Sequence, residues 1–408
     1  MENSLKAIFV YYIIKRFSCC TICKCSLKLI ETIATVRKMI IELSLTNFRN
    51  FDKAQLQLSP GLNIILGDNG MGKSNLLEAA YLCGFGRSFR GKGHTYVRFG
   101  EEFCRIDGKN MQNDVVQVIY LSGGTRNILF NGKKLMRISE LLGRFPGTYV
   151  GPQEVQIVSG APSQRRKLLD EHICQFDPIY TQELYNYNRS VQQRNASLRQ
   201  VARNEIAGGM ILIETIDEKV AEHGANVIRG RLKFIEELTP IASEIFSTLT
   251  GENTGELNLE YISAIADNPA VDNLAQIFME KLAGHRSRDR KFFQTTVGPH
   301  RDDLNICIGE LAAKYFASWG QARMISLGLY LGAAKLLSER VGRVPTLLLD
   351  DALAELDPNR AGTALELLPV IGQTIVATPH PSHLDDIENC KKFVFSEPGK
   401  LRREIEQS

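Results

Sequence analysis

A glycine-rich run between residues 67 and 74 has the composition of a phosphate-binding loop. It follows the apolar run 62–66, precedes a helix-forming stretch that begins at Asn75, and reads Gly67-Asp68-Asn69-Gly70-Met71-Gly72-Lys73-Ser74. Glycines let the backbone curl until successive N–H groups face phosphate oxygens, and the helix that follows adds its dipole. The spacing G-x4-G-K-S therefore predicts that Lys73 reaches the β- and γ-phosphates of a nucleotide and that Ser74 ligates Mg²⁺. The alternative is a glycine-rich turn without a ligand.

Two adjacent carboxylates end an apolar run much later in the chain. Residues 346–351 read Thr-Leu-Leu-Leu-Asp-Asp, and a phosphate loop needs such an acidic partner at the end of a core strand. Asp350 is predicted to hold Mg²⁺ through water, and Asp351 to act as general base or to orient the attacking water. Many buried strands end in aspartate, so the prediction depends on the order of the motifs along the chain. Gln153 is a further candidate for sensing the metal, although its local sequence matches poorly.

Two shorter motifs lie on either side of the acidic strand. Ser318-Trp319-Gly320-Gln321 precedes it, and Ala354-Glu355-Leu356-Asp357 follows it. They resemble the signature loop and the D-loop of ABC-type ATPases, in which signature N–H groups bind the γ-phosphate held by a second subunit. Ser318, Gly320, Gln321 and Asp357 are therefore candidate nucleotide contacts. A S-x-G-Q run on its own is also common as the turn that starts a helix, which is the alternative.

Taken together, the motifs resemble the RecF family of ABC/SMC-type ATPases. They occur in the order of that family over nearly all of 39–408, and the G-P-H-R-D-D run is the most family-specific of them. The segments that carry the resemblance are LTNFRNF (45–51), GDNGMGKSN (67–75), PSQRRKLLD (162–170), GPHRDD (298–303), FASWGQ (316–321) and LLLDDALAELD (347–357).

The resemblance implies a switch-like ATPase of recombinational repair and replication-fork maintenance. It implies ATP and Mg²⁺ as cofactors, an ATP-dependent homodimer, and weak, DNA-stimulated hydrolysis that releases the protein. It implies double-stranded DNA near single-strand gaps as the ligand, and RecR, RecO and the RecA recombinase system as partners. Two positions depart from the usual pattern: Trp319 replaces a small or amide residue, and Asp351 replaces the glutamate of most ABC ATPases, which fits slow hydrolysis.

The resemblance gives further residues two possible roles each. Arg49 in the first hairpin is expected to help hold the nucleotide, or else to be a surface arginine. His380 or His383 could be the switch histidine of this class, or a loop histidine. His300, Arg301 and Asp302 either contact nucleotide or DNA, or brace the ATPase head.

Three groups of arginine and lysine are candidate DNA contacts. The chain has a net charge of +3, of which residues 1–38 contribute +5 and residues 39–408 contribute −2. Because the larger part is slightly acidic, DNA binding needs local clusters of positive charge. The resemblance favours the first two groups as sequence-independent phosphate contacts; the alternative for every group is a solvated face. The groups are Arg87, Arg90 and Lys92, then Arg286, Arg288 and Arg290, and last Arg189, Arg194, Arg199 and Arg203 along one predicted helical region.

The composition fits a globular cytoplasmic protein that does not enter a membrane. Apolar residues make up 44% and charged residues 23% of the 408 residues, and no apolar run approaches the roughly 18 residues of a membrane span. Residues 1–38 include four clustered cysteines and no strand or helix periodicity, and the alternating pattern begins just after Met39. We expect Met39 to be the initiator and 1–38 to be an upstream extension; half of a zinc site and a poorly structured tail are the alternatives.

The elements around the motifs predict an α/β ATPase head with an inserted helical lobe. Alternating or apolar runs predict strands near 40–45, 54–58, 62–66, 115–121, 128–130, 147–150, 344–349 and 375–377, with a hairpin turn at Asn131-Gly132. Helical periodicity from 163 to about 280 predicts four to six helices, far too short for the long coiled coil of an SMC protein. The expected division is 39–155 and 291–408 for the head, and 156–290 for the lobe.

Two other functions compete with the repair ATPase. A nucleotide-binding subunit of a membrane transporter is disfavoured by the helical insert, the G-P-H-R-D-D run and the N-F-R-N-F start. An ABC-type nuclease is disfavoured because no acidic catalytic module follows the head.

Overall fold

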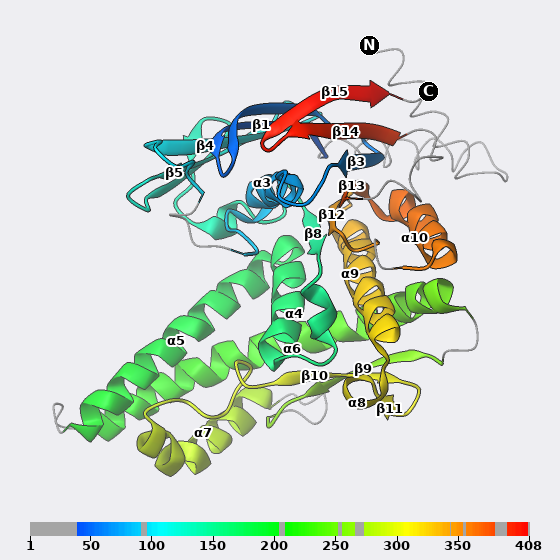
Figure 1. Cartoon of the computed structure of the whole chain (residues 1–408). Coiled ribbons are helices and arrows are strands. Elements are labelled where there is room, and N and C mark those ends of the chain that lie inside the picture. The colour runs from blue at the N-terminus through cyan, green and yellow to red at the C-terminus, as the bar shows by residue number, and fades with distance from the viewer. Residues whose placement is uncertain are drawn as a thin grey trace, which may run out of the picture.

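The computed structural model describes residues 39–90, 96–203, 209–251, 255–265, 273–342, 344–353, 356–379 and 390–406 (Figure 1). The expectations for 1–38, including the cysteine cluster, fall outside this part of the chain, as do those for Lys92, His380 and His383. Within the described residues, no helix is long and apolar enough to cross a membrane.

A six-stranded, mostly parallel sheet forms the base of the head. Its order is β15-β14-β3-β13-β12-β8, in which only β15 is antiparallel to its neighbour. Because β3 and β12 run parallel with β13 between them, the residues after Leu66 and those at Asp350 emerge at the same edge. The strands are β3 (Leu62–Leu66), β8 (Gly147–Val150), β12 (Thr346–Asp350), β13 (Gln373–Thr378), β14 (Cys390–Glu397) and β15 (Lys400–Glu406).

An antiparallel sheet lies over the first, and α3 (Lys73–Phe85) is held between the two (Figure 1). Nearly every residue of α3 is buried, in one hydrophobic core with both sheets. The predicted hairpin at 131–132 is confirmed, because Asn131 and Gly132 both have positive φ, at 49° and 77°, as a two-residue turn of this kind requires. The strands are β1 (Ile40–Phe48), β2 (Phe51–Gln57), β4 (Phe103–Asn110), β5 (Val115–Leu121), β6 (Arg126–Phe130) and β7 (Lys133–Lys134).

The helical lobe extends below the parallel sheet (Figure 1). Its described residues form four helices, within the expected range, and α5 packs along α6 as an antiparallel hairpin. The expectation of helix throughout 163–280 is wrong at β9 (Leu257–Ile262), which joins β10 (Asp303–Ile308) and β11 (Leu311–Ala312) in a small antiparallel sheet. The helices are α4 (Pro162–Phe176), α5 (Pro178–Ala202), α6 (Gly209–Thr250) and α7 (Leu274–Phe292).

The remaining elements connect the lobe to the sheet. The short helix α8 (Ala313–Phe316) leads into α9 (Trp319–Val341), which packs on α4, α6 and β8 and returns the chain to β12. Helix α10 (Pro358–Ile371) covers the same face beside α9. Two 3-10 turns, η2 (Ile138–Glu140) and η3 (Glu154–Ile157), flank β8.

Candidate nucleotide site

The glycine-rich run forms a tight loop between β3 and α3, as the sequence predicts. Gly72 has φ of 115°, and a Cβ there would lie 2.7 Å from the Asn50 side chain, so only glycine fits. Lys73 is 5% exposed, and its Nζ donates hydrogen bonds to the carbonyl oxygens of Gly67 (2.6 Å) and Asp68 (3.1 Å). The loop therefore surrounds a buried ammonium group at the start of a helix, which is an arrangement suited to polyphosphate.

Two β-turns brace this loop from outside. The Asn50 Nδ2, in the β1–β2 turn, and the Gly399 N–H, in the β14–β15 turn, both donate to the Met71 carbonyl oxygen at 2.9 Å. Asn50 also accepts a hydrogen bond from the Asn75 amide at 2.8 Å. The sequence motifs did not single out Asn50 or Gly399 as site residues; Asn50 stands next to Arg49, and only the fold brings Gly399 to the loop.

The acidic strand meets the loop through Asp350. The Ser74 Oγ donates to Asp350 Oδ1 at 2.8 Å, across 276 residues of sequence. Asp350 is 5% exposed, so this hydroxyl and carboxylate meet in a largely buried position. Hydroxyl and carboxylate oxygens are the ligands that Mg²⁺ prefers, so the residues present fit the ion.

Asp351 follows in a backbone conformation that non-glycine residues rarely adopt. Its φ is 51°, and its N–H donates to the Ala377 carbonyl oxygen of β13 at 2.9 Å. Such conformations cost roughly 1–3 kcal/mol and persist where the surroundings fix them. β12 thus ends at Asp350, and the backbone turns at Asp351 directly after it.

Tyr149 is a site residue that the sequence did not reveal. Its hydroxyl donates to Asp350 Oδ2 at 3.2 Å, and its ring stacks on Phe89, with centroids 3.7 Å apart. Burial, and then the Asp350 charge, raise the pKa of Tyr149 well above its ordinary value, so the hydroxyl remains a donor. The signal was weak: Tyr149 sits in a predicted short strand, but nothing in the sequence says that this strand lies beside β12.

Arg49 is held close to the loop helix. Its Nη2 and Nε donate to the two carboxylate oxygens of Glu78 on α3, at 2.8 and 3.0 Å, and its guanidinium lies 5.1 Å from the Tyr96 ring centroid. The Glu78 side chain is fully buried and that of Arg49 is 20% exposed. Arg49 is therefore a fixed part of the head, and its contact with a nucleotide stays a prediction.

The signature candidate lies far from the loop of its own chain. Figure 1 shows α8 and the first turn of α9 beside the small sheet of the lobe, well below α3 and the end of β3. Ser318 caps α9: its Oγ accepts from the Gln321 N–H, and the Gln321 side chain accepts from the Ser318 N–H at 2.9 Å. The helix start is therefore real, and Gly320 and Gln321 lie in its exposed first turn.

The other nucleotide candidates are less tightly placed. Asp357 caps α10 by accepting from the Arg360 N–H at 3.1 Å. Gln153 is exposed in the turn after β8, the strand that neighbours β12. Their roles at the nucleotide stay predictions.

The arginines of the three groups differ in their burial and in their ion-pair partners. Arg194 is fully buried between Asp217 and Asp289, so its interpretation as a solvated or DNA-contacting side chain is wrong: two carboxylates hold it inside the lobe. Arg286 pairs with Asp217 and Glu214, and Arg87 with Glu171. Arg288 and Arg290 are exposed on α7, and Arg90 is exposed beside Phe89.

The G-P-H-R-D-D run mainly braces the lobe. His300 contacts the Tyr187 hydroxyl through Nδ1 at 2.5 Å and the Thr295 carbonyl through Nε2 at 3.0 Å. Burial lowers the pKa of His300 to about 4, so the ring is neutral near pH 7. Asp302 accepts from the Tyr261 hydroxyl at 2.8 Å, and Asp303 accepts from Arg165 at 2.7 Å. For His300 and Asp302, bracing is the interpretation that these contacts support, whereas Arg301 is exposed.

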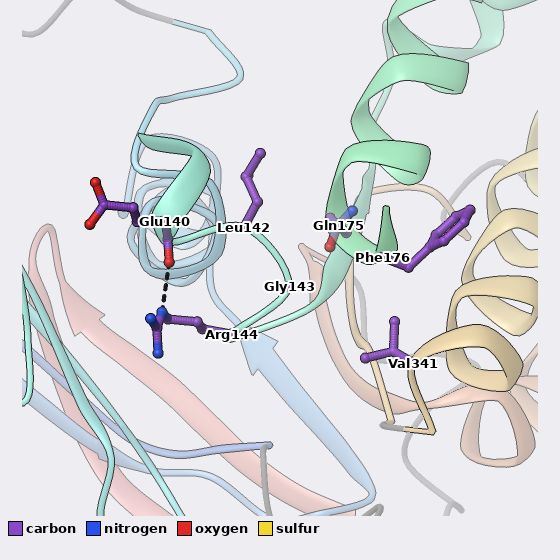
Figure 2. A pocket seen from close by; sticks show the side chains of 7 residues that line it. All are labelled: Glu140, Leu142, Gly143, Arg144, Gln175, Phe176 and Val341. Atoms are coloured by element: carbon purple, nitrogen blue, oxygen red, sulfur yellow. Dashed lines mark hydrogen bonds between the residues drawn. The ribbon is translucent and has the colours of Figure 1, made fainter. Parts of the chain in front are cut away.

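A pocket of about 320 Å³ lies at the opposite edge of the parallel sheet (Figure 2). Its polar groups make local contacts: Gln175 bonds the backbone of Gly147, and the Arg144 Nε donates to the Glu140 carbonyl oxygen at 2.6 Å. Because Gly147 begins β8, this pocket is at the amino ends of the strands and is not part of the nucleotide site. Its lining residues are Glu140, Leu142, Gly143, Arg144, Gln175, Phe176 and Val341.

Comparison with known proteins agrees with this geometry. Residues 39–401 match the family described as the RecF/RecN/SMC N terminal domain. The chain superposes on SMC head domains, including one bound to the C-winged helix domain of ScpA, with a TM-score of 0.54 at 16% identity over 90% of this chain and 98% of the other. The fold is thus that of an ABC/SMC-type ATPase head with an inserted helical lobe, and the part of the chain that the structure describes contains no long coiled coil.

Proteins with higher sequence identity to this chain define its family within this class of ATPases. A DNA replication and repair protein RecF of Clostridium perfringens is 34% identical over 361 residues, covering 87% of this chain and 97% of that one. The counterpart from Agathobacter rectalis is 36% identical over 338 residues, covering 81% and 90%. The structure of a recombination mediator protein RecF bound to ATP superposes with a TM-score of 0.82 at 32% identity, over 91% of this chain and 98% of that one. The chain belongs to the RecF family.

Proposed function

We propose that this protein is an ATP-dependent DNA-binding switch of recombinational repair and replication-fork maintenance, acting in the cytoplasm. ATP closes a homodimer on double-stranded DNA near single-strand gaps, and slow, DNA-stimulated hydrolysis releases it. RecR, RecO and the RecA recombinase system are the expected partners, as in the family to which the chain belongs. A membrane transporter subunit and an ABC-type nuclease are not favoured by any observation on this chain.

One observation supports the proposed homodimer. The start of α9, which Ser318 caps, is exposed and lies far from α3 and the end of β3 in the same chain (Figure 1), so it can reach a nucleotide only when that nucleotide is held by a second copy. The first turn of a helix offers N–H groups to an anion, which suits a γ-phosphate. Each nucleotide would then lie between the phosphate loop of one chain and the signature of the other.

Within one chain, Lys73 and the loop N–H groups would bind the phosphates, and Ser74 and Asp350 would hold Mg²⁺, with Gln153 near them. When bound, Mg²⁺ would neutralise phosphate charge. Tyr149 fixes one oxygen of Asp350 and leaves its partner oxygen directed at Ser74. Asp351, held by β13, would orient the attacking water, and its short side chain fits slow turnover. Asp357 and Arg49 would complete the site from the two sides of the interface.

The test is sedimentation of the full chain with and without ATP, in the presence and absence of duplex DNA. We expect a monomer without nucleotide, a dimer with ATP, and a dimer–duplex complex only when both are present. A chain that stays monomeric with ATP and duplex would contradict the proposal.

A further inference from the structure

A second pocket lies at the carboxyl end of α7, in the helical lobe. Its volume is about 240 Å³, and it is lined by Arg288, Phe292, Gln294, Thr296 and Arg301. Arg301 comes from the G-P-H-R-D-D run, in which His300, Asp302 and Asp303 bond to neighbouring elements of the lobe while Arg301 borders this pocket. The most family-specific motif of the chain therefore contributes an outward arginine that the nucleotide site does not use.

The two arginines of the pocket keep their charge available. Among the described residues, the Arg301 guanidinium donates to uncharged oxygens alone, those of the Gln294 side chain at 3.0 Å and the Thr295 carbonyl at 3.4 Å. Arg288 is exposed, and it forms no ion pair within the described residues. Arg286, two positions earlier on the same helix, is by contrast neutralised by Asp217 and Glu214. The pocket thus presents two guanidinium groups suited to phosphate oxygens.

An aromatic ring completes the pocket. The Phe292 side chain is 50% exposed at the wall of the cavity, and the Lys291 ammonium group lies 5.9 Å from its ring centroid. An exposed phenyl ring costs free energy in water unless something covers it. A ring beside arginines is the combination that holds an unstacked base and its phosphate.

The frame of the pocket is rigidly built. Asp289 is fully buried, and it accepts hydrogen bonds from the Thr296 N–H at 2.9 Å and the Thr296 hydroxyl at 2.6 Å. The same carboxylate binds the buried Arg194 guanidinium of α5 at 2.5 Å. This network fixes the loop after α7 against the helix, so that the backbone segments that carry Arg288 and Arg301 border the same cavity before any ligand arrives.

We propose that this pocket binds one unpaired nucleotide of single-stranded DNA, with its phosphate between Arg288 and Arg301 and its base on Phe292. A base in a duplex is stacked on both faces and cannot cover the ring, whereas a base next to a gap can. The site therefore reads the single-stranded side of a gap. This assignment rests on the DNA binding proposed above and adds to it a contact that the duplex alone does not provide.

The test measures binding of fluorescent oligothymidylate to the full chain by anisotropy over a salt series. Phe292→Ala should weaken binding roughly 5- to 100-fold, the usual effect of losing one base–aromatic stack, whereas Phe292→Tyr should bind as the unaltered chain does. Arg288→Gln and Arg301→Gln should each lower the salt slope by about 0.7, one phosphate contact on a single strand. Lys281→Gln is the matched control, because it removes one positive charge from an exposed position of α7 that lies outside the three arginine groups and does not line the pocket.

Three results would overturn the assignment. They are unchanged oligothymidylate binding in Phe292→Ala, a Lys281→Gln effect equal to that of Arg288→Gln, and binding of polyglutamate that depends on the arginines but not on Phe292, which would indicate an acidic protein partner. ATP-dependent binding of blunt duplex is measured on the same proteins. If the unaltered chain does not bind duplex in the presence of ATP, the proposed function is contradicted. If it binds duplex but any of the three results is found, only the assignment of the pocket is contradicted.

Discussion

Replacing Arg194 by methionine should be among the most destabilising single changes in the helical lobe. The Arg194 guanidinium is fully buried and bonds Asp217 and Asp289 at 2.5 Å each, and the Thr295 hydroxyl at 3.0 Å. Methionine fills much of the space but leaves both carboxylates buried, with only Asp217 still paired, to Arg286. Breaking a buried ion pair by removing one partner costs about 3–5 kcal/mol, a large share of the 5–15 kcal/mol that typically separates folded from unfolded states.

Urea unfolding followed by far-UV circular dichroism measures this cost. Arg189→Met is the matched control, because Arg189 is an exposed arginine on the same helix, and its replacement should change the free energy of unfolding by no more than about 0.5 kcal/mol. Adding Asp289→Asn to Arg194→Met should restore part of the loss, since an amide oxygen can still accept from Thr296 without leaving an unpaired charge. If Arg194→Met unfolds at the same urea concentration as Arg189→Met, the buried network does not hold α5, α6 and α7 together.

Four further outcomes follow from the site and its surroundings. Lys73→Met should abolish ATP-dependent duplex binding, whereas Asp351→Asn should keep ATP bound without hydrolysing it and stay longer on DNA in a dissociation assay; faster release would show that Asp351 does not orient water. Burial lowers the pKa of His172 to about 4 from an ordinary 6.5, so the unfolded chain takes up a proton first and stability should fall by ~3 kcal/mol between pH 6.5 and 4; His172→Gln should flatten that slope in thermal melts, and an unchanged slope would refute the assignment. Trp319, the chain's single tryptophan, is 63% exposed beside Ser318, so ATP should shift its fluorescence to shorter wavelength in the unaltered chain and leave it unshifted in Lys73→Met.

The sequence was sufficient wherever chemistry and position coincide in a short run. The loop at 67–74 needs glycines, a lysine and a serine at fixed spacing, and the run 346–350 is apolar until its final aspartate. The structure brings the loop and the end of the acidic strand to the same edge of the parallel sheet, where Ser74 and Asp350 touch. The hairpin at Asn131-Gly132 was equally local, because the backbone at both positions requires positive φ.

What the sequence missed depends on which elements become neighbours. Tyr149 reaches Asp350 only because β8 pairs with β12, and Gly399 reaches Met71 only because β14 pairs with β3. Arg194 has the appearance of a surface arginine until α6 and α7 bring Asp217 and Asp289 around it. β9 was hidden because its alternation is short and lies within a polar, helix-rich segment, where a partner strand 40 residues further on decides its conformation.

The shared nucleotide site is tested most directly by mixing two inactive chains. Lys73→Met disables the phosphate loop but leaves a sound signature, and Ser318→Arg does the reverse, because a bulky cation at the start of α9 should block docking on the other chain's γ-phosphate. Differently tagged proteins are mixed with ATP and duplex DNA, and pull-down and phosphate release are measured. The account predicts that each mutant alone stays monomeric and inactive, and that the mixture recovers dimer and part of the hydrolysis through its one complete site. A mixture that stays as inactive as its components, while the unaltered chain dimerises, would contradict it and leave Ser318 as a helix cap alone.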